Sequence, residues 1–189
     1  MPQGSPVELP PGQVLIADLP TVRVDAPPRV GATEWQFSVV TEYGAVRRWD
    51  WSAIRALPSE HVVADLHCVT GWSVLDTHWA GVPVRTLFDG VTTAATYALV
   101  DSYGGYTTNL PLEDLLDMPT WLATAFEGHD LRPEQGGPAR LLVPHLYLWK
   151  SVRWVRGITL SRQDRPGWYE RHGYHNYGDP WREQRFSGD

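Results

Sequence analysis

Apolar and polar residues alternate along several segments of this chain, and this pattern predicts more strands than helices. In residues 34–40 the alternation places Trp35, Phe37 and Val39 on one face of a strand. In residues 120–131 the alternation of Leu122, Thr124 and Phe126 is followed by a Glu-Gly pair, which favours a hairpin over a helix. Further strands are expected where apolar and β-branched residues follow one another, at 61–66, 96–100, 139–143 and 152–160.

Three short helices complete the expected secondary structure. Residues 50–57 begin with Asp50, a residue type that caps helices, and stop before Pro58. Two more short helices are expected at 84–91 and 112–118. Strands therefore outnumber helices, and the helices lie between them along the chain. This arrangement predicts the α+β fold class with a mixed β-sheet core.

Residues 1–33 differ from the rest of the chain because they are rich in proline and polar residues. We expect an extended N-terminal arm there and a single domain over residues 34–189, since 189 residues suffice for one core. No apolar run approaches the ~20 residues that span a bilayer, and the first residues lack the basic and apolar regions of a secretory signal. The sequence therefore predicts a cytoplasmic protein without a membrane span.

Charge is distributed unevenly along the chain. The formal net charge of −6 argues against a nucleic-acid-binding protein. Residues 140–171 are the exception, with seven basic and two acidic residues. Lys150, Ser151 and Arg153 lie together in this stretch and could bind a phosphate through their charges and the hydroxyl group. No glycine-rich phosphate loop accompanies them, so a solvated basic face is the alternative.

Cys68 is the only cysteine of the chain, so no disulfide forms within it. It follows an apolar run and opens a segment with Thr70, Gly71 and Ser73, at the kind of strand end where proteins present reactive groups. A buried inert thiol and a nucleophile assisted by a histidine are two alternatives, although the adjacent His67 would point to the opposite face. Ligands for a protein-built zinc site are too few, and one thiolate suffices only if an organic cofactor supplies the other sulfur ligands.

Residues 167–181 form the third candidate segment, with five aromatic residues and two histidines among glycines. Such a segment could stack against a sugar or a single-stranded nucleic acid. The acidic charge of the chain counts against nucleic acid. The alternative is a C-terminal segment that packs its aromatic side chains over the core.

Four blocks of sequence carry a resemblance to a known family. They are HCVTGWSVLDTHWAGVPVRTLFD (67–89), GGYTTNLPLEDLLD (104–117), GGPARLLVPHLYLWKSVRWVRGI (136–158) and GYHNYGDPWREQRF (173–186). In this order and spacing they resemble the molybdopterin-binding domain of the sulfite oxidase family, in its short bacterial branch of sulfite oxidase-like oxidoreductases. The resemblance covers residues 34–186 and implies that the chain has the sulfite oxidase-type fold.

The resemblance also implies a molybdenum–molybdopterin cofactor and the residues that hold it. Cys68 matches the cysteine that is the family's protein ligand to the metal, whether molybdenum or tungsten. The pterin dithiolene would supply two more sulfur ligands, which explains how one thiol can hold a metal. Contacts with the cofactor are implied for His67, Thr70, Ser73, Asp101 and Arg140, and contacts with its terminal phosphate for Lys150, Ser151 and Arg153.

Two-electron oxygen-atom transfer is the reaction that the resemblance implies, on a small sulfur-containing substrate that is sulfoxide- or sulfite-like. Trp72 and Ser73 stand where sulfite oxidases carry arginines for sulfite, which makes sulfite the less favoured substrate. Tyr174 matches a family tyrosine near the metal, and with His175 it is the candidate for orienting substrate or moving protons. The sequence contains no haem motif, so an external electron-transfer partner is expected. A cofactor-free binding module and a thiol enzyme based on Cys68 are the alternatives.

Overall fold

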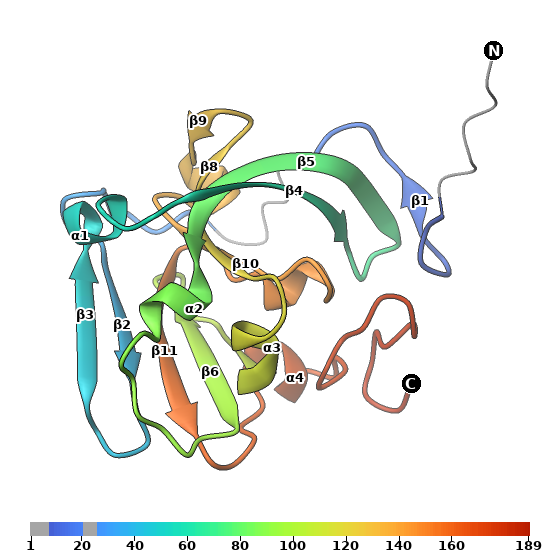
Figure 1. The fold of residues 1–189 in the computed structure, drawn as a ribbon. Helices are drawn as coiled ribbons and strands as arrows, with labels where there is room; N and C mark the ends of the chain where they lie inside the picture. The colour runs from blue at the N-terminus through green and yellow to red at the C-terminus, as the bar shows by residue number, and fades with distance from the viewer. Residues whose placement is uncertain (1–7, 21–25) are drawn as a thin grey trace.

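Two β-sheets form the framework of the computed structural model, which describes residues 8–20 and 26–189 (Figure 1). In the first sheet β1 (Val14–Leu15), β5 (Trp72–Pro83), β8 (Trp121–Phe126) and β10 (Arg140–Leu142) follow one another, while β4 (Glu60–His67) pairs with β5 and β9 (His129–Asp130) with β8. β1 runs parallel to β5, and the other pairs are antiparallel. The long β4–β5 hairpin therefore connects the N-terminal arm to the centre of this sheet.

The second sheet has five strands in the order β3 (Val46–Asp50), β2 (Gln36–Val40), β11 (Val155–Ser161), β6 (Tyr97–Ser102) and β7 (Thr107–Pro111). β11 runs parallel to β2 and antiparallel to β6, so the sheet is mixed. The main core lies between the two sheets. It joins β2 residues such as Phe37 and Val39 to Ile158 of β11 and Leu122 of β8.

All helices are short, as the sequence indicates. They are α1 (Trp51–Arg55), α2 (Val84–Leu87), α3 (Leu112–Leu116) and α4 (Trp168–Arg171), with single 3₁₀ turns η1 (Pro133–Gln135) and η2 (Leu148–Lys150). The Asp50 side chain accepts a hydrogen bond from the backbone N–H of Ala53, which caps α1 as expected. Within the described residues no helix is long and apolar enough to cross a membrane.

The structure confirms the α+β fold class with a mixed sheet core, but β5 occupies residues for which the sequence indicated no strand. Residues 68–71 form only a tight turn, and β5 begins at Trp72. Gly71 adopts φ +94°, a conformation that glycine reaches without strain, and this lets the turn stay short. The separation of an arm at 1–33 from a domain at 34–189 stays a prediction, and residues 1–7 and 21–25 lie outside the described part.

Candidate functional site

One cavity collects most of the residues that the sequence singled out. It has a volume of about 610 Å³ and opens beside the β4–β5 turn. Its wall combines this turn, the first half of β5, the arm at 17–20 and the segment 132–153. Of the predicted site residues, it is lined by Cys68, Thr70, Arg140, Ser151, Arg153 and Tyr174.

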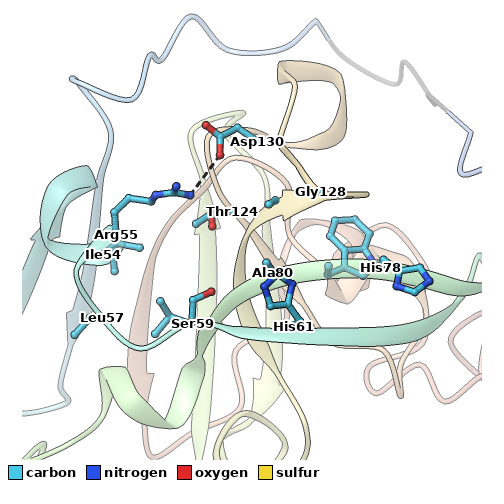
Figure 2. A pocket seen from close by; sticks show the side chains of 13 residues that line it. Ile54, Arg55, Leu57, Ser59, His61, His78, Ala80, Thr124, Gly128 and Asp130 are labelled. Carbon is cyan, nitrogen blue, oxygen red and sulfur yellow. Dashed lines mark hydrogen bonds and ion pairs between the residues drawn. The ribbon is translucent and has the colours of Figure 1, made fainter.

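A second cavity, of about 360 Å³, lies between α1, the β4–β5 hairpin and the β8–β9 hairpin (Figure 2). Arg55 and Asp130 form an exposed ion pair of 3.3 Å across its rim. Two exposed histidines, His61 and His78, also line it. None of the predicted site residues lies in its wall. The first cavity is therefore the candidate site.

Cys68 stands at the start of the tight turn that joins β4 to β5. Its backbone N–H donates to the carbonyl of Trp72 at 2.8 Å, and its own carbonyl accepts from Gly71 N–H at 3.0 Å. The Sγ atom lies 3.1 Å from the Thr70 hydroxyl oxygen, and the residue is half-buried. The turn thus presents a thiol in the cavity wall, with a neighbouring hydroxyl that can hydrogen-bond to it.

Arg140 places a buried positive charge in the same wall. It is 5% exposed, and its Nη1 and Nη2 donate to the carbonyls of Gln135 and Ser151 at 3.2 and 2.9 Å. Its Nε is buried without a hydrogen-bond partner, and among the described residues no carboxylate lies within ion-pair distance of it. Burial lowers the pKa of Arg140 to about 10, so the group is still charged at neutral pH. A buried charge without a counter-ion is costly and calls for an anion.

Ser151 and Arg153 surround Arg140 on the same segment. The Ser151 hydroxyl accepts from the backbone N–H of Val143 at 2.9 Å. The backbone N–H of Arg153 donates to the Tyr106 hydroxyl at 2.6 Å, and burial raises the pKa of that tyrosine. Four acidic residues also line the cavity, of which Asp18, Asp76 and Glu127 are exposed and Glu134 is half-buried. Among the described lining residues, Arg140 accordingly carries the only fully buried charge.

Lys150 does not take the place that the sequence suggested. Its side chain is fully buried and does not line the cavity. The Nζ atom lies 2.7 Å from Glu170 Oε1 and also donates to Asn109 and to the Asn176 carbonyl. An ammonium has three protons, and these acceptors use all of them. The expected role of Lys150 as a phosphate ligand therefore does not fit its placement, whereas Arg153 lines the cavity and its phosphate role stays a prediction.

His67, Ser73 and Asp101 also lie outside the cavity lining. His67 and Ser73 are paired across the β4–β5 hairpin and are buried behind the turn. The Ser73 hydroxyl donates to Gln13 Oε1 at 3.2 Å, so its oxygen accepts from His67 Nδ1 at 2.8 Å. Asp101 lies on β6 in the second sheet, opposite Gly157 of β11. Side chains on a strand alternate between its faces, which is why His67, adjacent to Cys68 in sequence, does not line the cavity with it.

The aromatic C-terminal segment packs on the protein and also contributes rings to the cavity wall. Tyr169 and Tyr174 line the cavity together with Trp149, and their ring centroids lie 5.2 Å apart. His175 points elsewhere, because its Nδ1 accepts from the backbone N–H groups of Tyr177 and Gly178 at 3.0 and 3.1 Å. The segment thus closes one side of the site while packing on the protein. Tyr174 lines the cavity, and its role toward a substrate stays a prediction, whereas His175 shapes a turn.

Three lining residues were missed by sequence reasoning, namely Tyr106, Arg132 and Trp149. Arg132 lies before the basic stretch at residues 140–171. Trp149 precedes Lys150 in η2, and the two side chains point in different directions: that of Trp149 lines the cavity, whereas that of Lys150 does not. A count of basic residues beginning ten residues earlier would have included Arg132, but nothing in the sequence distinguishes Tyr106 from the other tyrosines.

Protonation of His67 provides a test of the packing behind the turn. Burial lowers the pKa of His67 below its usual value of 6.5, against a smaller opposite effect of Asp65. The unfolded chain therefore binds more protons than the folded one as the pH falls below about 6.5. We expect the free energy of unfolding to decrease with falling pH in this range, and His67→Gln to make the decrease shallower. Urea unfolding from pH 8 to pH 5 measures this, and parallel curves for both proteins would contradict it.

Comparison with known proteins assigns the family. The family profile described as oxidoreductase molybdopterin binding domain matches residues 23–169, most of the chain. The chain belongs to this family. It is therefore an oxidoreductase of a molybdopterin-binding family, as the four sequence blocks indicated.

Relatives of this family member include short and long proteins. The chain is 41% identical to the uncharacterized oxidoreductase YuiH of Bacillus subtilis, over 96% of this chain and 93% of that protein. It is 26% identical to the putative protein-methionine-sulfoxide reductase subunit YedZ1 of Azospira oryzae, over 69% of this chain and 50% of that protein. The catalytic subunit MsrP of a protein-methionine-sulfoxide reductase from Gluconobacter oxydans is also 26% identical, over 66% of this chain and 46% of MsrP. The chain thus spans about half the length of these two sulfoxide reductases.

The fold has a counterpart among solved structures. The sulfane dehydrogenase SoxCD from Paracoccus pantotrophus matches with a TM-score of 0.65 at 17% sequence identity. The match covers 73% of this chain and 41% of the SoxCD chain. At this identity the comparison establishes the shared fold, and it confirms the sulfite oxidase-type architecture expected from the sequence.

Proposed function

We propose that this protein binds a molybdenum–molybdopterin cofactor in the 610 Å³ cavity and uses it for two-electron oxygen-atom transfer on a small sulfur-containing substrate. The observation that carries the proposal is the meeting of two groups in one cavity wall. One is the chain's only cysteine, and the other is the buried Arg140, whose charge has no protein counter-ion among the described residues. The sulfur of Cys68 suits a soft metal, and the guanidinium of Arg140 suits a phosphate.

The residues present fit such a cofactor. Arg140 has a buried Nε–H that finds no acceptor in the protein, and an anion in the cavity would supply one. Arg153 and Ser151 line the cavity together with Arg140, so three residues could contact one phosphate. Cys68 supplies a thiolate ligand at a different part of the wall. Among the described residues no cluster of three or more protein ligands could hold a metal alone, and the family cofactor brings its own sulfur ligands.

Each part of the site would then have a definite task. When bound, the cofactor supplies a metal that exchanges an oxygen atom and two electrons with the substrate. Cys68 would hold this metal, and Arg140 and Arg153 would hold the phosphate. The aromatic rings of Trp149, Tyr169 and Tyr174 would keep water from the site, and the Tyr174 hydroxyl could orient a substrate oxygen or donate a proton to it.

The substrate class is supported by the relatives and by the turn. The curated names of the relatives include two protein-methionine-sulfoxide reductases, and SoxCD is a sulfane dehydrogenase. Trp72, rather than an arginine, follows the Cys68 turn and lines the cavity. A neutral sulfur compound such as a sulfoxide fits this wall better than the sulfite anion. The electron partner is external to the described domain in this proposal, and the cytoplasmic location stays a prediction.

The decisive measurement is the metal and pterin content of protein purified from a host that makes the cofactor. We expect close to one molybdenum or tungsten per chain, together with the fluorescence of an oxidised pterin released on denaturation. A folded protein without metal or pterin would contradict the proposal. In that case, alkylation of the thiol would distinguish an enzyme based on Cys68 from a binding module that has no activity to lose.

The role of Arg140 gives a second expected result. In Arg140→Met the buried charge is gone, and the cofactor loses a hydrogen bond to a charged group, worth about 1.5–3 kcal/mol. We therefore expect cofactor affinity to fall about 10- to 100-fold, seen as low molybdenum content after dialysis. Arg156→Met is the matched control, because Arg156 is exposed and lies outside the cavity lining. Equal metal content in both variants would place the anion elsewhere.

A further inference from the structure

The turn that carries Cys68 has few contacts of its own, and two distant segments hold its backbone in place. Residues 68–71 make the two hydrogen bonds that close the turn, from Cys68 N–H and Gly71 N–H. The Val69 and Gly71 carbonyls take no part in these two bonds, and the Cys68 carbonyl, which accepts from Gly71 N–H, can accept a second hydrogen bond. Figure 1 shows this end of the β4–β5 hairpin between β1 and the C-terminal segment. Each of the three carbonyls accepts a hydrogen bond from one of those two segments.

The N-terminal arm holds the first side of the turn. The backbone N–H of Val14 donates to the Gly71 carbonyl at 2.9 Å, and that of Ile16 donates to the Ser73 carbonyl at 2.9 Å. The Gln13 side chain adds a contact at the cysteine itself, where its Nε2 donates to the Cys68 carbonyl at 3.1 Å. Gln13 Oε1 accepts from the Ser73 hydroxyl, so both ends of this amide are engaged. Gln13 therefore fixes the peptide group that follows the thiol.

The C-terminal segment holds the second side through one guanidinium. Arg185 Nη1 donates to the Val69 carbonyl at 2.6 Å, and Nη2 donates to the Pro11 carbonyl of the arm at 3.0 Å. The guanidinium carbon lies 5.3 Å from the centre of the Tyr147 ring, and the side chain is 17% exposed. The planar fork of arginine can satisfy two carbonyls in fixed directions, which the single ammonium of lysine cannot do. One side chain thus joins the turn, the arm and the core.

We propose that Arg185, with Gln13, is a positioning residue for Cys68, because it fixes the backbone of residues 68–71 and with it the direction of Sγ into the cavity. The inference rests on the proposed function in that Cys68 is taken as the metal ligand. It adds that the ligand is held ready by both chain ends before any cofactor binds. Neither residue lines the cavity, so neither is proposed to contact the cofactor.

Alkylation of the full-length, cofactor-free protein tests this directly, because Cys68 is the only cysteine and a single added mass reports on it alone. Arg185→Gln removes hydrogen bonds from a charged donor to the turn, so we expect Cys68 to react with iodoacetamide about 10-fold faster or more. Arg185→Lys keeps the charge but loses the fork, and we expect an increase of several-fold there too. Because the charge is unchanged in Arg185→Lys, a faster alkylation there would come from the lost backbone contacts and not from an effect of charge on the thiol.

Two measurements separate positioning from a general loss of stability. If the turn opens locally, the alkylation rate changes little with low concentrations of urea, whereas opening by global unfolding makes it rise steeply. Arg182→Gln serves as the control, because Arg182 is exposed in the same segment, and its rate should equal that of the wild type. If Arg185→Gln does not fold, Gln13→Leu removes the bond to the Cys68 carbonyl and should accelerate alkylation in the same way.

The outcomes decide the two proposals separately. Alkylation rates of both Arg185 variants and Gln13→Leu within about two-fold of Arg182→Gln would overturn the positioning role, since a lost bond to a charged group should exceed that. A rise that follows global unfolding in urea would overturn it as well. The metal content of the wild type tests the proposed function independently, because the alkylation experiment uses no cofactor.

Discussion

Cys68→Ser is expected to abolish substrate turnover while the protein stays folded and keeps part of its cofactor. The substitution changes one atom, so the turn closed by Cys68 N–H and Gly71 N–H persists. A serine hydroxyl does not replace a soft thiolate as a metal ligand at neutral pH. Arg140 and Arg153 remain available to the phosphate. Because changes to residues behind metal ligands cost about 10- to 100-fold, loss of the ligand itself should cost more.

Turnover is measured with a small sulfoxide and a reduced dye as electron donor, per molybdenum bound rather than per chain. Thr70→Val is the matched control, since it removes the hydroxyl 3.1 Å from Sγ and leaves the thiol in place. We expect it to lose less activity than Cys68→Ser, at most the about 10- to 100-fold that a change behind a metal ligand costs. Wild-type rates in metal-loaded Cys68→Ser would contradict the ligand role. Full activity in metal-free wild-type protein would instead favour a thiol enzyme.

Lys150→Met is expected to destabilise the protein by about 3–5 kcal/mol, the cost of breaking a buried ion pair from one side. The Nζ atom is 2.7 Å from Glu170 Oε1, and the two side chains are 0% and 2% exposed. Without Lys150 the Glu170 carboxylate stays buried, with only Thr108 and the indole N–H of Trp149 as donors at 2.6 and 3.1 Å. Since Trp149 lines the cavity, cofactor content should also fall.

The double variant Lys150→Met with Glu170→Leu is the informative control. It removes both charges, and replacement of a whole buried ion pair by apolar side chains is often close to neutral. We therefore expect urea unfolding to show less destabilisation in the double variant than in Lys150→Met alone. The exposed pair of Arg55 and Asp130 provides a second reference, because Arg55→Met should cost no more than about 1 kcal/mol. A loss below that value in Lys150→Met would refute the argument.

Local features of the fold were predictable from the sequence because neighbouring residues determine them. The Asp50 cap of α1, the turn at Glu127 and Gly128 between β8 and β9, and the strand β2 all appear where the pattern placed them. β3, β5 and β7 were harder to predict. Buried polar residues such as Ser73 and Thr77 interrupt the apolar alternation of β5, and their partners lie in other segments.

In the candidate site, too, some features can be predicted from the sequence, whereas others depend on contacts between distant segments. That Cys68 is unique and that the basic residues cluster near Arg140 can be counted in the sequence alone. The sequence does not show which of the basic residues faces the cavity, because Lys150 and Arg153 are three positions apart in the same stretch. A 3₁₀ turn ending at Lys150 directs that ammonium to Asn109, Glu170 and Asn176, all distant in sequence.

By itself, then, the sequence determined the family, the fold class, the single thiol and the basic stretch that contains Arg140 and Arg153. Only the tertiary structure decided that Arg140 is a buried charge with no counter-ion among the described residues, that Lys150 belongs to an internal ion pair, and that the segments around Gln13 and Arg185 hold the turn at Cys68. The physical reason is the same in each case. The free energy of a buried polar group depends on which partners the fold brings to it, and these partners are far away along the chain.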